Sequence, residues 1–117
     1  MSNFTTLSKD GYSVIVMNSD SLDTQTTAEL RSELVLLAGG GVKDMVLDLS
    51  HCHYCDTAGL SAILIAHRLC KDGHLVLSGV SEEVGNMLSI QRFDPELIIE
   101  SNLSDAEQKM NTIIAAQ

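Results

Sequence analysis

A short segment near the middle of the chain holds most of the residues that could carry chemistry. Cys52 and Cys55 are separated by two residues, and His51 and His53 lie beside them. This spacing is typical of zinc sites and of thiol–disulfide exchange. In an extended segment, however, Cys52 would face away from Cys55 and from both histidines, so the four ligands would diverge. We therefore expect no metal site and no cofactor here, and zinc binding is the alternative hypothesis. Reduced thiols are expected because the chain has three cysteines, an odd number, and no export signal.

The next two residues, Asp56 and Thr57, lie where a strand-like segment passes into a helix-like one. A short side-chain oxygen at such a position can cap the helix by accepting a hydrogen bond from an unpaired backbone N–H. A hydroxyl there is also exposed, and the helix dipole tolerates added negative charge. Thr57 is therefore either a cap alone or a phosphoryl acceptor. A phosphate would add roughly −1.5 to −2 charges beside Asp56, enough to repel a partner with a neutral or acidic surface.

The elements that must position this segment are two buried strands and a helix. Residues 45–49 and 75–77 are short, nearly continuous apolar runs, as expected for strands that are covered on both faces. A helix over about 57–71 joins them. Such a strand–helix–strand unit implies a right-handed crossover between parallel neighbours. Because α/β folds commonly place their sites outside the carboxyl ends of parallel strands, we expect the functional site in the loop between 48 and 60.

The N-terminal part of the chain predicts a hairpin followed by a helix. The turn signal Asp10-Gly11 separates two strand-like runs at 4–7 and 14–17. A polar loop over 18–25 precedes Thr26 and Glu29, which have capping-box spacing and predict the helix start. The helix then ends at three consecutive glycines, 39–41.

The C-terminal part predicts two more helices around a last strand. Ser81 can cap a helix that runs to about residue 90, and 97–99 is a strand-like apolar run. Ser104 and Glu107 repeat the capping-box spacing and predict the start of the last helix. The expected order is β-β-α-β-α-β-α-β-α, which is an α/β fold: a mixed, mostly parallel sheet with about four helices.

The helix after Thr57 is apolar on two sides. Leu60, Ile63 and Leu64 share one side, and the opposite side carries a second stripe, composed of Ala62, Ile65, Ala66 and Leu69. A helix on the outside of a small sheet needs only one apolar stripe for its core. The second stripe therefore indicates either a docked partner protein or a neighbouring helix that covers it.

Composition restricts the class of partner. The chain has 117 residues, of which 44% are hydrophobic, so we expect a single domain over 1–117. Sixteen acidic and seven basic residues give a net charge of −9, and there are only two Phe, two Tyr and no Trp. This balance repels nucleic acid and anionic membranes and leaves few rings to stack on bases. A protein partner is expected.

The sequence lacks the signals of export, membrane insertion and catalysis. No apolar run approaches the roughly 18 residues that span a bilayer, and the N-terminus does not resemble a signal peptide. We therefore expect a cytoplasmic protein with no direct membrane insertion. Nucleophile-elbow, P-loop and dinucleotide motifs are also missing from the sequence, so we expect no enzymatic activity.

The motif Asp56-Thr57-Ala58-Gly59-Leu60, which follows the strand at 46–50, resembles the STAS family, and the element order agrees across nearly the whole chain. In the anti-sigma factor antagonists of that family the motif is typically Asp-Ser-Ser-Gly-Leu. A partner anti-sigma factor that is also a kinase phosphorylates the first Ser. The resemblance therefore implies that Thr57 is the acceptor. Here Thr replaces the usual Ser, and Ala58 lacks the second hydroxyl.

A second likeness concerns Asp23, which resembles the acidic residue of the family's Gly-Glu-Leu-Asp loop near the phosphorylation site. In this chain the loop reads Asp-Ser-Leu-Asp over 20–23 and lacks the glycine. The resemblance together with the second apolar stripe predicts a partner-binding surface with the following members: Asp23, Asp56, Thr57, Ala58, Gly59, Ser61, Ala62 and Ile65.

The resemblance implies a STAS fold and a bacterial regulator of transcription. Such a protein would bind an anti-sigma factor that is a serine/threonine kinase, would be released when Thr57 is phosphorylated, and would be reset by a phosphatase. The motif is also similar to the STAS subunit of bacterial phospholipid-trafficking ABC transporters, which binds the ATPase without phosphorylation control. That is the alternative function. The helix predicted after 97–99 fits the antagonists better.

Overall fold

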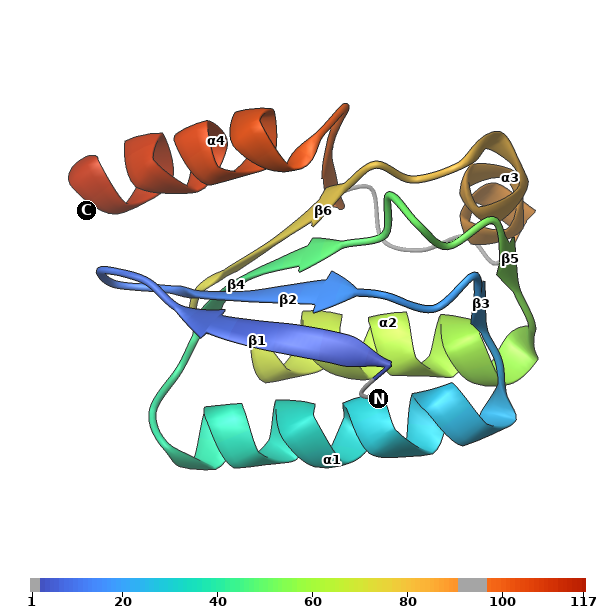
Figure 1. Ribbon diagram of the computed structural model, residues 1–117. Coiled ribbons are helices and arrows are strands. Elements are labelled where there is room, and N and C mark those ends of the chain that lie inside the picture. Colours follow the sequence, from blue (N-terminus) through green and yellow to red (C-terminus); the bar gives the residue numbers. More distant parts are fainter. Residues whose placement is uncertain (1–2, 91–96) are drawn as a thin grey trace.

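The structure, a computed structural model, describes residues 3–90 and 97–117 (Figure 1). A five-stranded sheet with the order β1-β2-β4-β6-β7 runs through its centre. Its strands are β1 (Phe4–Ser8), β2 (Ser13–Met17), β4 (Asp44–Asp48), β6 (His74–Ser78) and β7 (Ile98–Glu100). β1 pairs with β2 in antiparallel fashion, and the later pairs are parallel. The predicted hairpin and the mixed, mostly parallel sheet are confirmed.

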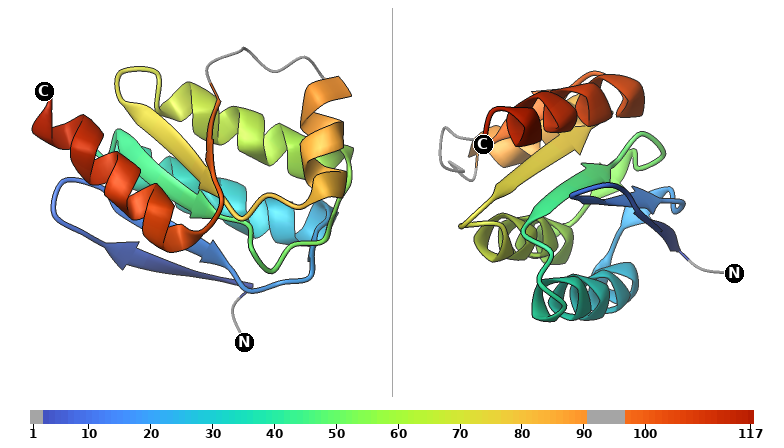
Figure 2. Two further views of the ribbon diagram at one scale, coloured as in Figure 1. Left: turned by 90° about the horizontal axis from the view of Figure 1, so that it is seen from above. Right: turned by 90° about the vertical axis from the view of Figure 1, so that its left-hand side faces the viewer.

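Helices cover both faces of this sheet. α1 (Thr24–Gly39) and α2 (Thr57–Leu69) lie side by side on one face, and α4 (Leu103–Ala115) lies on the other, as the end view in Figure 2 shows. α3 (Glu82–Ile90) lies at the end of the sheet where the parallel strands finish. None of the helices in the described ranges combines the length and apolar character needed to cross a bilayer.

Covering both faces explains the continuous apolar runs in the central strands. In β4, Met45 and Leu47 pack into the core beneath α1 and α2, while Val46 packs on the opposite side. Val14, Val46 and Val76 are paired in register across three neighbouring strands. α4 covers this row with its two buried residues, Ala106 and Met110. Because successive side chains in a strand point to opposite faces, both faces need apolar residues.

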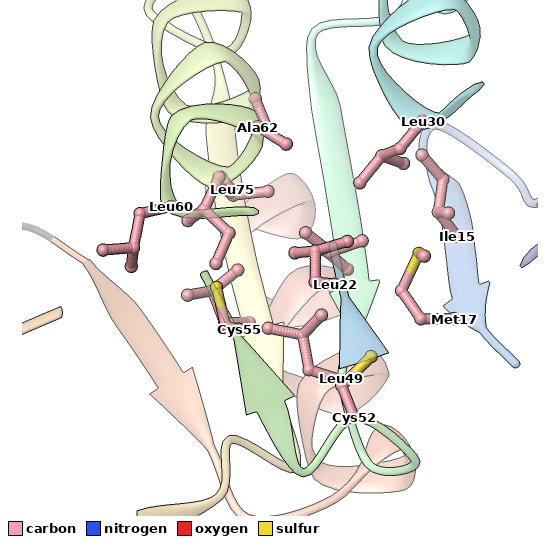
Figure 3. Packing of buried hydrophobic residues seen from close by; sticks show 14 of the residues in the cluster. Ile15, Met17, Leu22, Leu30, Leu49, Cys52, Cys55, Leu60, Ala62 and Leu75 are labelled. Atoms are coloured by element: carbon pink, nitrogen blue, oxygen red, sulfur yellow. The ribbon is translucent and has the colours of Figure 1, made fainter. Parts of the chain in front are cut away.

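Two short strands were not predicted. β3 (Ser21–Leu22) and β5 (Tyr54–Cys55) pair in parallel as a separate two-stranded sheet. The sequence predicts loops for both segments, because two residues are too few to show a strand period. Their pairing arises from tertiary packing, since Leu22 and Cys55 are both buried in the core of the α1 and α2 face (Figure 3).

Two predicted helix starts were wrong by two or three residues. α1 begins at Thr24 because Asp23 caps it, with Asp23 Oδ1 accepting from the Thr26 N–H at 3.0 Å. The predicted cap, Thr26, is buried inside the first turn. α4 begins after Asn102, not at Ser104. In both cases an earlier Asp or Asn, which are strong capping residues, takes the position.

The remaining predicted helix boundaries agree with the structure. Ser81 caps α3, since its hydroxyl accepts from the Val84 N–H at 3.2 Å. α1 ends in the glycine run, where Gly40 is the C-cap and Gly41 has a φ of 96°. A positive φ favours glycine because it has no Cβ.

Candidate functional site: two helix starts at one end of the sheet

The β3–β5 pair brings two helix N-termini together. Leu22 pairs with Cys55, so the next residues, Asp23 and Asp56, follow the pair in register. The Asp56 N–H also donates to the Leu22 carbonyl at 3.4 Å. α1 and α2 start immediately afterwards, on the right of Figure 1. Asp23 and Asp56 were predicted to belong to one site, and this pairing places them side by side.

Each aspartate caps its own helix with the same geometry. Asp56 Oδ1 accepts from the Gly59 N–H at 2.9 Å, as Asp23 Oδ1 does from the Thr26 N–H. The hydrogen bonds from Thr26 lower the pKa of Asp23, because they favour the ionised carboxylate. The prediction that Asp56 or Thr57 caps α2 is confirmed for Asp56. The Thr57 hydroxyl is thus not the cap of α2.

Thr57 is the first residue of α2, and its side chain is exposed. Ser61, one turn further along, is also exposed, and Ala58 is half-buried. Residues four apart lie on the same side of a helix, so Thr57 and Ser61 form the outer face of the first turns. A phosphoryl group on Thr57 would extend into solvent and displace no core residue.

Gly59 has a structural role that corrects its predicted place on the partner surface. It is buried, and an added Cβ would clash with the Leu22 carbonyl oxygen and lie 2.6 Å from the Cys55 sulfur. The absence of a side chain therefore lets the β3–β5 pair lie directly against α2. Gly59 holds the site together from within and is not exposed to a partner.

Ala62 also requires correction, because it is fully buried in the core and is not accessible at the surface. The second apolar stripe of α2 faces the protein core. Ala66 is buried as well, and Ile65 and Leu69 are partly buried and pack against the same core. α1 lies beside α2 and supplies Leu30 and Leu34 to that core. Of the two interpretations of this stripe, a docked partner or a neighbouring helix, the structure therefore shows the neighbouring helix.

The two cysteines of the C-x-x-C segment are core residues. Cys52 donates its thiol hydrogen to the Ser19 carbonyl at 3.2 Å, and Cys55 donates to its neighbour's carbonyl at 3.3 Å. Burial raises the pKa of each thiol to about 11, which disfavours the thiolate needed for metal binding or exchange.

The histidines of this segment point elsewhere. His51 and His53 are exposed, so the predicted divergence of Cys52 from the histidines is confirmed. Cys55, predicted to face with the histidines, instead shares the buried side with Cys52, because the segment between them is not regularly extended. The N–H groups of His53 and Tyr54 both donate to the Asp20 carbonyl, at 2.8 and 3.4 Å. Within residues 3–90 and 97–117, no group of three or more His, Cys, Asp or Glu could hold a metal ion.

One candidate was missed by sequence reasoning. Tyr54 in β5 is 55% exposed, beside the start of α2. Exposed tyrosines frequently anchor protein interfaces, because the ring contributes a large contact area and a hydroxyl. The available signal was its rarity, since the chain has only two tyrosines and the other, Tyr12, is buried.

The fold and site together define a small α/β domain whose conspicuous feature is an exposed surface at two helix starts. The family model described as STAS domain matches residues 3–106, and the chain belongs to the STAS family. α4 extends beyond the matched residues and still packs on the sheet.

Solved structures share this fold. A variant of RsbS from Moorella thermoacetica is 23% identical and superposes with a TM-score of 0.82, covering 99% of this chain and 100% of that one. The anti-sigma factor antagonist SpoIIAA in its unphosphorylated form is 15% identical, with a TM-score of 0.75 and coverage of 93% and 97%. The phosphorylated Bacillus SpoIIAA has the same identity, 15%, a TM-score of 0.73 and coverage of 91% and 97%. No curated protein sequence is significantly similar to this chain.

Proposed function

We propose that this chain is an anti-sigma factor antagonist that binds an anti-sigma factor with serine/threonine kinase activity and is switched by phosphorylation of Thr57. The observation that carries the proposal is the position of Thr57. Its hydroxyl is exposed at the first position of α2, next to a capping aspartate and to a second capped helix. A kinase could reach this hydroxyl without opening the fold.

The switch would work through charge. Asp23 and Asp56 already place two carboxylates at this end of the molecule, and a phosphoryl group would add roughly −1.5 to −2 charges beside them. A partner that accepts the unmodified surface would then meet strong like-charge repulsion or unpaired charge. The helix N-termini partly offset the added charge within this chain, so the domain itself would stay folded.

The likeness to SpoIIAA supports the proposal at the level of fold. That protein is known in an unphosphorylated and a phosphorylated form, and both superpose on this chain with similar TM-scores. A fold of this kind therefore accommodates phosphorylation in that protein. By extension, the proposed partner surface here comprises Asp23, Asp56, Thr57, Ala58 and the outer face of α2. We expect the protein to act in the cytoplasm of a bacterium.

The residues predicted for this surface divide into exposed ones, which can contact a partner, and buried ones, which cannot. Ser61 and Tyr54 are exposed and half-buried Ile65 borders the core, so all three can contact a partner to some degree. Gly59 and Ala62 act only by supporting the surface from within.

We expect substitution of Tyr54 by Ala to weaken partner binding while leaving the fold intact, because about half of its ring is exposed to solvent.

The proposal is tested by mass spectrometry of the protein isolated from its native cells with bound partners, with and without phosphatase treatment. A phosphate on Thr57, together with a kinase-like partner, supports it. Unmodified Thr57 in a phosphatase-insensitive complex with a transporter ATPase would replace it with the alternative function, an adaptor subunit of a phospholipid-trafficking ABC transporter.

A binding assay with matched variants sharpens the test. Thr57→Glu mimics the added charge and should weaken binding of the isolated partner by more than about a hundredfold, since like charges across an interface cost several kcal/mol. Ser104→Glu is the control, because Ser104 is exposed in the first turn of α4, on the face of the sheet opposite to α1 and α2 (Figure 2). Equal binding by both variants would contradict a switch centred on Thr57.

A further inference from the structure

A cavity of about 560 Å³ lies at the opposite end of α2 from Thr57. It is formed by the last turn of α2, the turn into β6 and the edge strand β7, and its basic lining residues are His67, Arg68, Lys71 and His74. Cavities that bind small molecules typically measure roughly 300–1,000 Å³, so this one is large enough to hold a small metabolite.

The cavity lining is basic, whereas the protein as a whole is acidic. The protein carries a net charge of −9 and has only seven Lys and Arg residues and four histidines. Arg68, Lys71 and two of those histidines nevertheless share one cavity. Within the described residues, neither Arg68 nor Lys71 forms a salt bridge with a carboxylate. Within that part of the chain, no direct carboxylate contact neutralises either positive charge.

No Asp or Glu is among the described residues that line the cavity. The carboxylates nearest to it along the chain belong to Asp72, exposed in the turn, and to Asp44, which is buried behind His74. Asp44 is 3% exposed, and its Oδ1 accepts from the His74 N–H at 2.8 Å and lies 3.2 Å from His74 Nδ1. At the end of α2, the carbonyls of Ala66, Arg68 and Cys70 accept backbone N–H groups of the following turn. Asp44 keeps its negative charge behind His74, so the formal charges of the described lining itself are those of Arg68 and Lys71.

The turn between α2 and β6, which lines the cavity, packs closely against the start of β4. Gly73 lies against the strand start, where an added Cβ would clash with the Lys43 carbonyl oxygen and lie 2.7 Å from Asp44 Oδ1. Leu75 and Ile98 add an apolar wall to the same cavity. The cavity lining thus combines two cations with a hydrocarbon surface.

We propose that this cavity binds the phosphoryl group of a small molecule, with Arg68 and Lys71 as its ligands. The planar guanidinium of Arg68 can bind two phosphate oxygens at once, and Lys71 supplies a compact point charge. The organic part of a phosphate ester would contact Leu75 and Ile98. This site is independent of the proposed switch, since the thirteen residues of α2 separate it from Thr57 by roughly 20 Å.

The test is a titration of the full chain with two probes, inorganic phosphate and glycerol 3-phosphate, followed by calorimetry and by amide NMR shifts, with sodium chloride at matched ionic strength as the reference. We expect shifts concentrated over residues 67–75. The double variant R68Q/K71Q should bind at least about tenfold more weakly, which corresponds to ~1.4 kcal/mol. Tighter binding of the ester identifies an organic phosphate, and tighter binding of the inorganic ion identifies free phosphate.

The control is R31Q/K109Q, which removes the same charge from exposed positions outside the cavity. It should bind the probes as the unaltered chain does. The proposal is overturned if neither probe binds, if both double variants lose affinity equally, or if the shifts lie elsewhere on the protein. The NMR map of the unaltered chain decides the matter even if R68Q/K71Q were to fold poorly.

Discussion

The starts of α1 and α2 are built alike, yet they differ in what surrounds them. Each follows a two-residue strand of the same small sheet, each is capped by an aspartate, and each has threonine as its first residue. At the third helical position, however, α1 has a buried threonine, Thr26, whereas α2 has Gly59. The local capping signal is therefore shared, and the packing beneath it is not.

The surroundings of the two helix starts also differ at the surface. α2 starts beside the exposed ring of Tyr54, and its outer face continues through Ser61. The start of α2 is pressed against β3 through Gly59, so its position is set by the core. The two similar helix starts therefore allow the effect of a charge placed at Thr57 on stability to be compared with that of a charge placed at Thr24.

The largest effect on stability is expected at Gly59. Replacement by Ala would force a Cβ against Leu22 and Cys55, and overpacking of this kind costs about 1–3 kcal/mol. Urea denaturation measures the loss. Gly39→Ala, at the end of α1, is the control, because an added Cβ there meets nothing within 4 Å. An unchanged midpoint in Gly59→Ala would show that α2 and the β3–β5 pair are not packed as described.

The next effect is the loss of the α2 cap. Asp56→Ala removes the oxygen that accepts from the Gly59 N–H and should lower the free energy of unfolding by about 0.5–2 kcal/mol. Asp56→Asn retains a capping oxygen and should unfold close to the unaltered protein in the same urea titration. If Asn and Ala are equally destabilising, charge rather than capping is the contribution of Asp56.

A smaller effect is expected on the pH dependence of the free energy of unfolding, through Asp23 at the start of α1. The pKa of Asp23 lies below its ordinary value of 3.8, so its ionised form stabilises the fold above that pH. The contribution is lost as pH falls through the lowered pKa of the folded state. Asp23→Asn keeps the cap and should flatten the pH dependence of unfolding in the acid range. Asp72→Asn, an exposed residue in the turn after α2, removes an equal charge and should leave that dependence in place.

The smallest change in stability is expected for Thr57→Glu and Thr24→Glu. Each adds a carboxylate to a first helical turn, which the helix dipole favours by about 0.3–1 kcal/mol, while the neighbouring cap carboxylate opposes it. Thermal unfolding should therefore place both variants near the unaltered protein. A Thr57→Glu chain that unfolds would show that this position cannot accept added charge and would remove the physical basis of the proposed switch.

The sequence predicted the larger elements and the place of Thr57 at the start of a helix. The apolar runs of β4 and β6, the glycine stop of α1, the Ser81 cap and the position of Thr57 all follow from local patterns. It did not predict β3 and β5, because a two-residue strand has no period of its own. It also placed the α1 cap at Thr26 instead of Asp23, since both residues have capping side chains and only the packed position of the turn distinguishes them.

The sequence by itself therefore determined the α/β order of elements, the resemblance to the STAS family and the hydroxyl at the start of α2. These depend on short-range periodicity, capping and a five-residue motif. Only the tertiary structure decided that Asp23 lies beside Asp56, that Ala62 and Gly59 are buried, and that Arg68 and Lys71 share a cavity. Such relationships join residues that are distant along the chain or on different helix faces, and they exist only once the sheet and its helices have packed.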